Sequence, residues 1–300
     1  MAGFGELAAF GTALSWSFSN QIQSAIARVV GPSGVALLRL PYQIALLGCM
    51  CLILREDTSL TWQGFWLLTL SGIGGVAYCD FVLYKSVVIV GPTMAVLLQS
   101  LSAAFTAVFG WVFLQEVLPL QASLGIVLTL VGVAWVVTER GGSVLLPWQE
   151  VPCGKTLAMG IFYGFSCGVV LSVSFIFLRM AMQTGVQPLW ATLVRVFMGA
   201  VVLWALGCVR GWSGAAIKDL KAHPRLYWML LISTSCGAGG MWLSSVALKL
   251  APAGVVATLI GLQPITVALV GAVWYRRCPS LRVALGSLIA FGGSALVCLR

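Results

Sequence analysis

The sequence predicts an all-α membrane protein with ten transmembrane helices arranged as two inverted five-helix repeats. The composition, the apolar runs and a repeat of prolines and glycines support this prediction. The chain has 300 residues, of which 60% are hydrophobic and 8% charged, and its mean hydropathy is +1.02. This number of polar side chains is too small to cover a water-facing surface. We therefore expect the chain to be embedded in a lipid bilayer.

Ten apolar runs account for most of the chain. A spanning helix needs about 20 apolar residues, so ten helices use roughly 200 positions. The runs of the first half cover residues 5–28, 34–54, 63–84, 92–115 and 119–137. Those of the second half cover residues 156–178, 187–209, 226–248, 252–275 and 280–299.

Charged residues mark the ends of these runs, because a charge is costly in hydrocarbon. In chain order, the charges that close the runs are Arg28, Arg55, Lys85, Glu116, Glu139, Arg179, Arg210, Lys249, Arg276 and Arg300. The longest connections, residues 138–155 and 210–225, are too short for a soluble domain. We therefore expect a first repeat over residues 1–140, a connecting loop over 141–155 and a second repeat over 156–300.

The second half repeats the order of prolines and glycines found in the first. Two proline pairs recur at an offset of 160 residues and two glycine pairs at 161, which one inserted residue explains. These pairs are Pro92 and Pro252, Pro119 and Pro279, Gly125 and Gly286, and Gly132 and Gly293. Because five helices are an odd number, the second repeat must enter the membrane from the opposite side. Inverted repeats with a site at their interface are typical of secondary transporters.

Other function classes find little support in the sequence. His223 is the single histidine, none of the nine cysteines forms a CxxC motif, and no GxxxxGK[ST] motif is present. Catalysis, a metal site and direct ATP coupling are therefore not expected. The formal charge is +9, but the basic residues are scattered, so nucleic-acid binding is not expected either. We expect no cofactor.

Polar side chains near mid-membrane are the candidate substrate-binding residues. Gln99 and Ser102 share one helical face with Thr106, and Gln263 lies on the corresponding face of the second half. The remaining candidates are aromatic or polar residues on other runs: Trp16, Asn20, Tyr78 and Tyr163. These groups favour a cavity for an amphipathic solute such as an amino acid. Alternatively, they form hydrogen bonds that hold helices together.

Charged residues inside the apolar runs form two candidate pairs. Arg39 and Asp80 fall on one side of the membrane at similar depth, whereas Glu116 and Arg195 fall on the other side. Arg39 and Arg195 occupy equivalent positions in the two repeats. Each pair is interpreted either as a structural ion pair near an interface or as a gate or proton site.

Several motifs resemble the EamA-type members of the drug/metabolite transporter superfamily. They are Trp16, Arg39, the stretch Cys79-Asp80-Phe81-Val82-Leu83-Tyr84, the stretch from Gly91-Pro92 to Phe113-Leu114-Gln115-Glu116, Gly125 and Gly132-Val133. The resemblance covers essentially the whole chain and implies a metabolite exporter with both termini in the cytoplasm. One departure is Arg276-Arg277, which stands where the family commonly has a second glutamate.

The distribution of positive charge predicts the opposite orientation. Leaving out Arg39 and Arg195, eleven Lys or Arg residues lie on the side of the odd-numbered loops and four on the other side. By the positive-inside rule the side with eleven is cytoplasmic, which places both termini outside. The orientation therefore stays open.

We expect a secondary transporter of a small metabolite that works by alternating access. The expected location is a bacterial inner membrane, and the expected partners are the solute and lipid. Proton coupling and exchange both stay open, and no oligomer is required. The alternatives are a channel and a non-transporting assembly or sensor protein.

Overall fold

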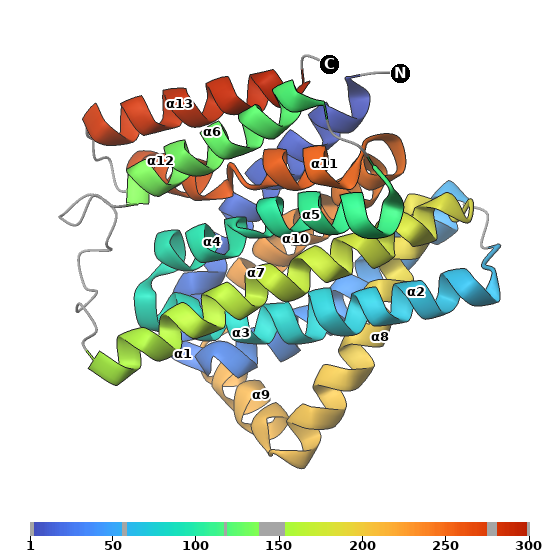
Figure 1. The fold of residues 1–300 in the computed structure, drawn as a ribbon. Coiled ribbons are helices and arrows are strands. Elements are labelled where there is room, and N and C mark those ends of the chain that lie inside the picture. The colour runs from blue at the N-terminus through green and yellow to red at the C-terminus, as the bar shows by residue number, and fades with distance from the viewer. Residues whose placement is uncertain (1–2, 56–58, 117–118, 138–153, 275–280, 299–300) are drawn as a thin grey trace.

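The protein forms a bundle of helices (Figure 1). The structure is a computed structural model that describes residues 3–55, 59–116, 119–137, 154–274 and 281–298. Three predictions lie outside these ranges: the role of Arg276-Arg277, the place of Pro279, and most of the loop over 141–155. In chain order the helices are α1 (Phe4–Leu54), α2 (Trp62–Gly72), α3 (Cys79–Val90), α4 (Pro92–Ser100), α5 (Ser102–Leu114), α6 (Leu120–Val137), α7 (Gly154–Gln183), α8 (Pro188–Val209), α9 (Trp212–Ala222), α10 (Pro224–Leu250), α11 (Ala253–Ile260), α12 (Gln263–Trp274) and α13 (Leu281–Cys298).

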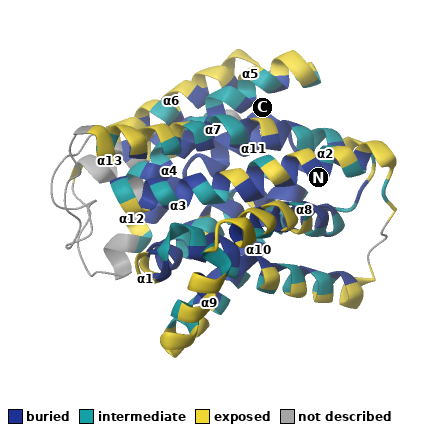
Figure 2. Cartoon of the chain, turned by 90° about the horizontal axis from the view of Figure 1, so that it is seen from below, coloured by how far each residue is buried: buried dark blue, intermediate teal, exposed yellow. Residues whose placement is uncertain are grey.

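Several helices have the length and composition of membrane spans. Among the described residues, six qualify: Phe4–Leu54, Trp62–Val90, Met94–Leu114, Lys155–Gln183, Pro188–Val209 and Pro224–Leu250. Two shorter apolar helices cover Leu120–Gly132 and Ala253–Val267. The prediction of an all-α, multi-pass membrane protein is therefore confirmed, whereas the count of ten crossings stays a prediction. Figure 2 shows buried residues gathered between the helices and exposed residues on their outward faces.

Helix α1 contains the first two predicted runs, separated by a kink at Gly31. Gly31 has φ 75° and ψ 160°, which is not helical and is a backbone conformation that glycine adopts readily. Pro32 follows directly and lacks the N–H that a continuous helix would require. The kink lets both parts of α1 contribute residues to the centre of the bundle.

A π-helical segment over Ile73–Tyr78 joins α2 to α3. Its wider turn is visible in the hydrogen bond from the Cys79 N–H to the Gly74 carbonyl, five residues back. Such insertions shift the residues that follow around the helix axis and often occur at functional sites. The third predicted run is therefore a helix with an altered register, and it extends to Val90.

The fourth and ninth predicted runs are each interrupted midway. A turn at Leu101 separates α4 from α5, and a turn at Gly261 and Leu262 separates α11 from α12, with Leu101 and Gly261 keeping right-handed helical angles. We expected both runs to be continuous because their apolar character does not change at the breaks. The two breaks lie in the equivalent runs of the two sequence halves.

Helices α6 and α13 pack through glycines that recur in the repeat. A Cβ atom added at Gly132 of α6 would lie 2.6 Å from the backbone nitrogen of Ala290 and 2.7 Å from the Gly286 carbonyl oxygen. A Cβ atom added at Gly293 of α13 would lie 2.6 Å from the backbone nitrogen of Thr129. The contact is therefore reciprocal and antiparallel, as an approximate two-fold axis between equivalent helices requires.

Helix α9 lies in a stretch that the sequence predicts to be only a connection. It packs against α1, where a Cβ atom added at Gly34 would lie 3.3 Å from the Ala216 Cβ. The Trp212 ring also stacks on Phe81, with ring centroids 5.3 Å apart. Because α9 has only 11 residues and several charges, it has no apolar run that would reveal it.

Candidate functional site

A central cavity lies where α1, the π-helical segment, α3, α4, α7, α8, α10 and α12 meet. Its volume is about 50 Å³. The residues that line it are Trp16, Ser19, Asn20, Arg39, Gly75, Cys79, Asp80, Leu83, Gln99, Leu171, Phe175, Arg195, Gly237, Met241 and Gln263. A cavity of this size holds only a few water molecules, so a larger solute requires the lining helices to move apart.

Four of the predicted substrate-binding residues line this cavity. Trp16 and Asn20 come from α1, Gln99 from the last turn of α4 and Gln263 from the first turn of α12. The two glutamines therefore stand at the two helix breaks, one from each half of the chain. Interrupted helices in corresponding positions of two repeats are a typical location of transporter binding sites. Contact of these residues with a substrate stays a prediction.

The two glutamines present unsatisfied polar atoms. Both side chains are buried, and Gln99 Oε1 and Gln263 Nε2 have no hydrogen-bond partner within the described part of the chain. One is an acceptor and the other a donor. Leaving such groups unpaired in a dry interior costs about 1–3 kcal/mol each, so they favour a polar ligand or water in the cavity.

Arg39 and Asp80 form an ion pair at the cavity wall. The pair was predicted from chain direction, and the structure contains it; a role as a gate or proton site stays a prediction. Arg39 Nη1 also donates a hydrogen bond of 3.1 Å to the Tyr84 hydroxyl. Asp80 keeps 14% of its side chain exposed and faces the cavity, so the pair is accessible from it.

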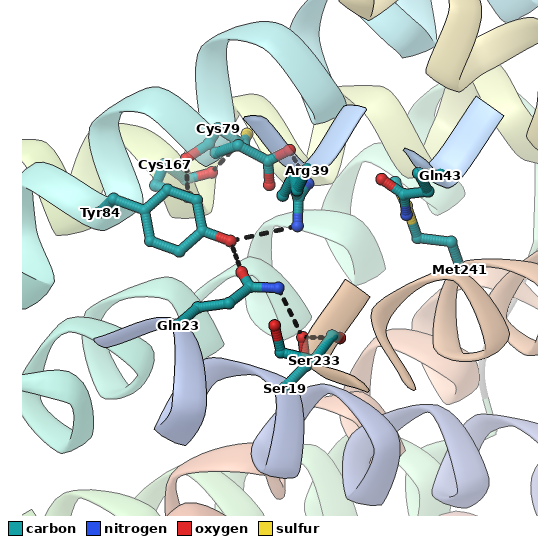
Figure 3. Close-up of polar contacts among 10 residues, drawn as sticks. Ser19, Gln23, Arg39, Gln43, Cys79, Tyr84, Cys167, Ser233 and Met241 are labelled. Carbon is teal, nitrogen blue, oxygen red and sulfur yellow. Dashed lines mark hydrogen bonds and ion pairs between the residues drawn. The ribbon is translucent and has the colours of Figure 1, made fainter. Parts of the chain in front are cut away.

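A chain of hydrogen bonds continues from this ion pair to α10 (Figure 3). The Tyr84 hydroxyl donates to Gln23 Oε1, and Gln23 Nε2 donates to Ser19 Oγ over 2.8 Å. The Ser19 hydroxyl then donates to the Ser233 carbonyl over 2.8 Å. These hydrogen bonds hold both parts of α1 against α3 and α10. They thereby fix the position of one wall of the cavity.

Arg195 reaches the same cavity from α8. It is 2% exposed, and its Nη2 donates a long hydrogen bond of 3.3 Å to the Ser174 hydroxyl. Two glycines before Asp80 make room for it: a Cβ added at Gly72 would collide with the Arg195 backbone, and one at Gly75 would lie 3.2 Å from Nη2. These glycines therefore serve close packing, one of the two roles that small residues have in membrane helices.

Three predicted site residues do not line the cavity. Tyr78 is 40% exposed because the π-helical segment shifts the register and turns Gly75, Cys79 and Asp80 inward instead. Ser102 begins α5 beyond the break, where its carbonyl accepts a 3.0 Å hydrogen bond from Ser172. Ser102 is buried, but it does not line the cavity as Gln99 does.

Tyr163 lies too far along α7 to reach the cavity. Residues Leu171 and Phe175 of the same helix line it instead. Eight residues of helix separate Tyr163 from Leu171, a distance of about 12 Å along the axis. The Tyr163 ring lies 5.3 Å from Lys85 Nζ, near the end of α3. Helix α7 extends beyond the predicted run at both ends, so the two have nearly the same centre, and Tyr163 lies in the N-terminal half of both.

The predicted pair between Glu116 and Arg195 is wrong. Glu116 Oε1 accepts a 2.9 Å bond from Arg179 Nε, and Oε2 accepts a 2.9 Å bond from the Ala253 N–H. Arg179 Nη1 also donates to the carbonyls of Leu248 and Lys249. Arg179 marked only the end of a run in the sequence, so nothing there singled it out. The resulting contact joins the end of α5 to α7 and to the connection between α10 and α11.

Replacing Glu116 with glutamine is expected to lower the free energy of unfolding by about 1–3 kcal/mol, because a charged acceptor is lost from Arg179 and from the first turn of α11. The apparent melting temperature in detergent measures this effect. Glu6→Gln is the matched control, since Glu6 makes only an exposed bond to the Gly3 N–H. Equal melting temperatures for both variants would contradict a stabilising role for this contact.

Several residues that line the cavity carry no polar signal in the sequence and were not predicted. They are ordinary apolar residues of α3, α7 and α10: Leu83, Leu171, Phe175 and Met241. Gly237 belongs to a cluster with Gly239 and Gly240, which carries no polar signal either. Their side chains give the cavity an apolar wall beside its charged one.

Comparisons with known proteins agree with this architecture. The sequence profile of the EamA-like transporter family matches residues 3–138 and 158–299, in two copies that correspond to the two halves. A solved structure described as "Crystal structure of protein" has a TM-score of 0.71 and 18% sequence identity. That similarity covers 100% of this chain and 99% of the other, and it shows the fold. No curated protein sequence matches. Since the profile covers both halves, the resemblance predicted from the sequence is confirmed: the chain belongs to the EamA-like transporter family.

Proposed function

We propose that the protein is a secondary transporter that exports a small metabolite, such as an amino acid or another amphipathic solute, by alternating access. One observation carries the proposal: two interrupted helices, one from each half, bring Gln99 and Gln263 to a single buried cavity. In secondary transporters, such breaks place polar groups at the substrate site near the membrane midplane. A bacterial inner membrane is the proposed location.

Two features of the bundle support alternating access. The reciprocal contact between α6 and α13 fits halves related by an approximate two-fold axis, so that each half can adopt the conformation of the other. The cavity of about 50 Å³ has room for only a few water molecules, so we expect that loading a larger solute requires movement of helices. A channel would instead need a continuous polar pore.

Counterflow in proteoliposomes tests this proposal. The full chain is reconstituted into vesicles loaded with an unlabelled metabolite, and a trace of the radiolabelled metabolite is added outside. A transporter that alternates access accumulates label transiently above its equilibrium level, whereas a channel only equilibrates it. If no metabolite in a panel of amino acids and related amphipathic solutes shows counterflow, the proposal fails and a sensor or assembly role is favoured.

Replacing Gln99 with alanine is expected to slow this counterflow about tenfold. The variant removes a buried amide that would pair with the solute, and one such hydrogen bond contributes about 1–1.5 kcal/mol. Tyr78→Ala is the matched control, because Tyr78 lies outside the cavity and is half-exposed on the outer face of its helix. Both proteins should have the elution profile of the unmodified chain. A defect in Tyr78→Ala as large as that in Gln99→Ala would argue against the assigned cavity.

A further inference from the structure

The charges that line the central cavity do not balance. Arg39 and Arg195 both line it, but Asp80 is the single carboxylate among its lining residues. Asp80 is committed to Arg39 through their ion pair. Asp80 also attracts Arg195 across the cavity, yet one carboxylate neutralises only one of two guanidinium groups. One positive charge is therefore left uncompensated.

A difference between the two repeats causes this imbalance. Arg39 and Arg195 are equivalent in the two halves, and the glycine clusters that begin at Gly72 and Gly237 are equivalent as well. Ser245 follows Gly237 at the same distance at which Asp80 follows Gly72, so Ser245 is the equivalent of Asp80 in the second repeat. The Ser245 hydroxyl bonds to Thr192 over 2.7 Å and carries no charge. The first repeat thus provides a counterion for its arginine, and the second does not.

Arg195 has spare hydrogen-bonding capacity directed at the cavity. Its Nε atom is buried without a partner, and within the described ranges no carboxylate lies within ion-pair distance of its guanidinium. Among the described residues, its guanidinium donates the long hydrogen bond to the Ser174 hydroxyl. A guanidinium with free N–H groups can bind a carboxylate through two parallel hydrogen bonds. Burying such a charge without a counterion is unfavourable, so an anion that enters the cavity is favoured.

We propose that the cavity binds a monocarboxylate, with the carboxylate of the solute on Arg195. This inference rests on the proposed function and names its substrate class. The unpaired Gln99 Oε1 accepts a hydrogen bond from a donor elsewhere on the solute, and Gln263 Nε2 donates one to an acceptor. The apolar part of the solute lies against Trp16, Phe175 and Met241, which also line the cavity. One excess positive charge matches one carboxylate.

Matched pairs of acids and amides test the charge requirement. The detergent-purified full chain is titrated at constant ionic strength with sodium isovalerate, sodium benzoate and L-leucine. The counterparts lack the carboxylate: the amides isovaleramide and benzamide, and the amino alcohol L-leucinol. A ligand that binds the folded state raises the apparent melting temperature in a saturable way. At least one acid is expected to do so, and its counterpart is expected to bind at least tenfold more weakly.

Variants of Arg195 assign the effect to this residue. Arg195→Gln is expected to weaken binding of the acid at least tenfold and to leave the amide unchanged. Arg195→Lys, which keeps the charge but loses the planar fork, is expected to bind the acid with intermediate affinity. Lys218→Gln is the control for net charge, since Lys218 is exposed on α9, and it should bind the acid as the unmodified chain does.

Three results would overturn the inference: equal binding of acids and amides, unchanged binding in both Arg195 variants, or no stabilisation by any acid. The counterflow experiment separates this failure from failure of the proposed function. Counterflow confined to solutes without a carboxylate would leave a transporter without a carboxylate site. Binding that depends on Arg195 without any counterflow would leave a carboxylate site in a protein that does not transport.

Discussion

Replacing Asp80 with asparagine is expected to destabilise the protein by about 3–5 kcal/mol. Arg39 is buried and forms its ion pair with Asp80, so the variant leaves a guanidinium without a counterion in the membrane interior. Loss of one partner of a buried pair costs more than the pair itself contributes, because the remaining charge stays desolvated. Since arginine remains protonated at every accessible pH, the loss should persist across the pH range.

Thermal unfolding in detergent between about pH 6 and pH 9 measures this effect. The double variant Asp80→Asn with Arg39→Gln removes both charges and should recover a large part of the lost stability, as a double-mutant cycle reports. Asp219→Asn on α9 is the control, because Asp219 lies outside the cavity and should change the melting temperature little. A fully stable Asp80→Asn protein that exchanges solute but no longer concentrates it with a pH gradient would identify Asp80 as a proton-coupling site instead.

Replacing Gly132 with alanine is expected to destabilise the protein by about 1–3 kcal/mol through overpacking. The added Cβ would lie 2.6 Å from the Ala290 backbone nitrogen, where no flexible side chain can yield. Helices α6 and α13 must therefore separate. The approximate two-fold relation predicts that Gly293→Ala has a similar effect, since its Cβ would meet the Thr129 backbone at 2.6 Å.

Gly292→Ala is the matched control for both variants. It lies beside Gly293 on α13, but an added Cβ has no neighbour within 4 Å. Its melting temperature should stay at the value of the unmodified chain or rise slightly, because alanine favours the helix. If Gly292→Ala and Gly132→Ala lowered the melting temperature by similar amounts, glycine would matter here for helix flexibility and not for close packing.

The sequence predicted well those features that depend on local composition. Long apolar runs closed by charges correspond to helices, and the repeated glycines Gly132 and Gly293 lie where α6 and α13 pack against each other. The pair between Arg39 and Asp80 could also be inferred, because chain direction alone places the two residues on one side of the membrane. These inferences need only the length of a helix and the direction of the chain.

The sequence predicted the lining of the cavity only in part. Four of the predicted residues line it: Trp16, Asn20, Gln99 and Gln263. Three others do not: Tyr78, Ser102 and Tyr163. The failure at Tyr78 arises because the prediction assumed a regular α-helix, and the failure at Tyr163 arises because the sequence does not show which turn of a long helix faces the cavity. The π-helical segment turns Tyr78 outward, Ser102 lies beyond the turn at Leu101, and Tyr163 lies about two turns before the residues of α7 that line the cavity.

By itself, the sequence determined that the chain is a helical membrane protein with two related halves, because hydrophobic length and repeat spacing are properties of the chain alone. Only the tertiary structure decided that Arg195 shares a cavity with Arg39 and Asp80, and that Glu116 pairs with Arg179. Which side chains meet depends on how far each helix is rotated about its axis, and a single inserted residue or break changes that rotation. The apolar pattern in a membrane constrains this rotation weakly, since lipid and protein interior are similarly apolar.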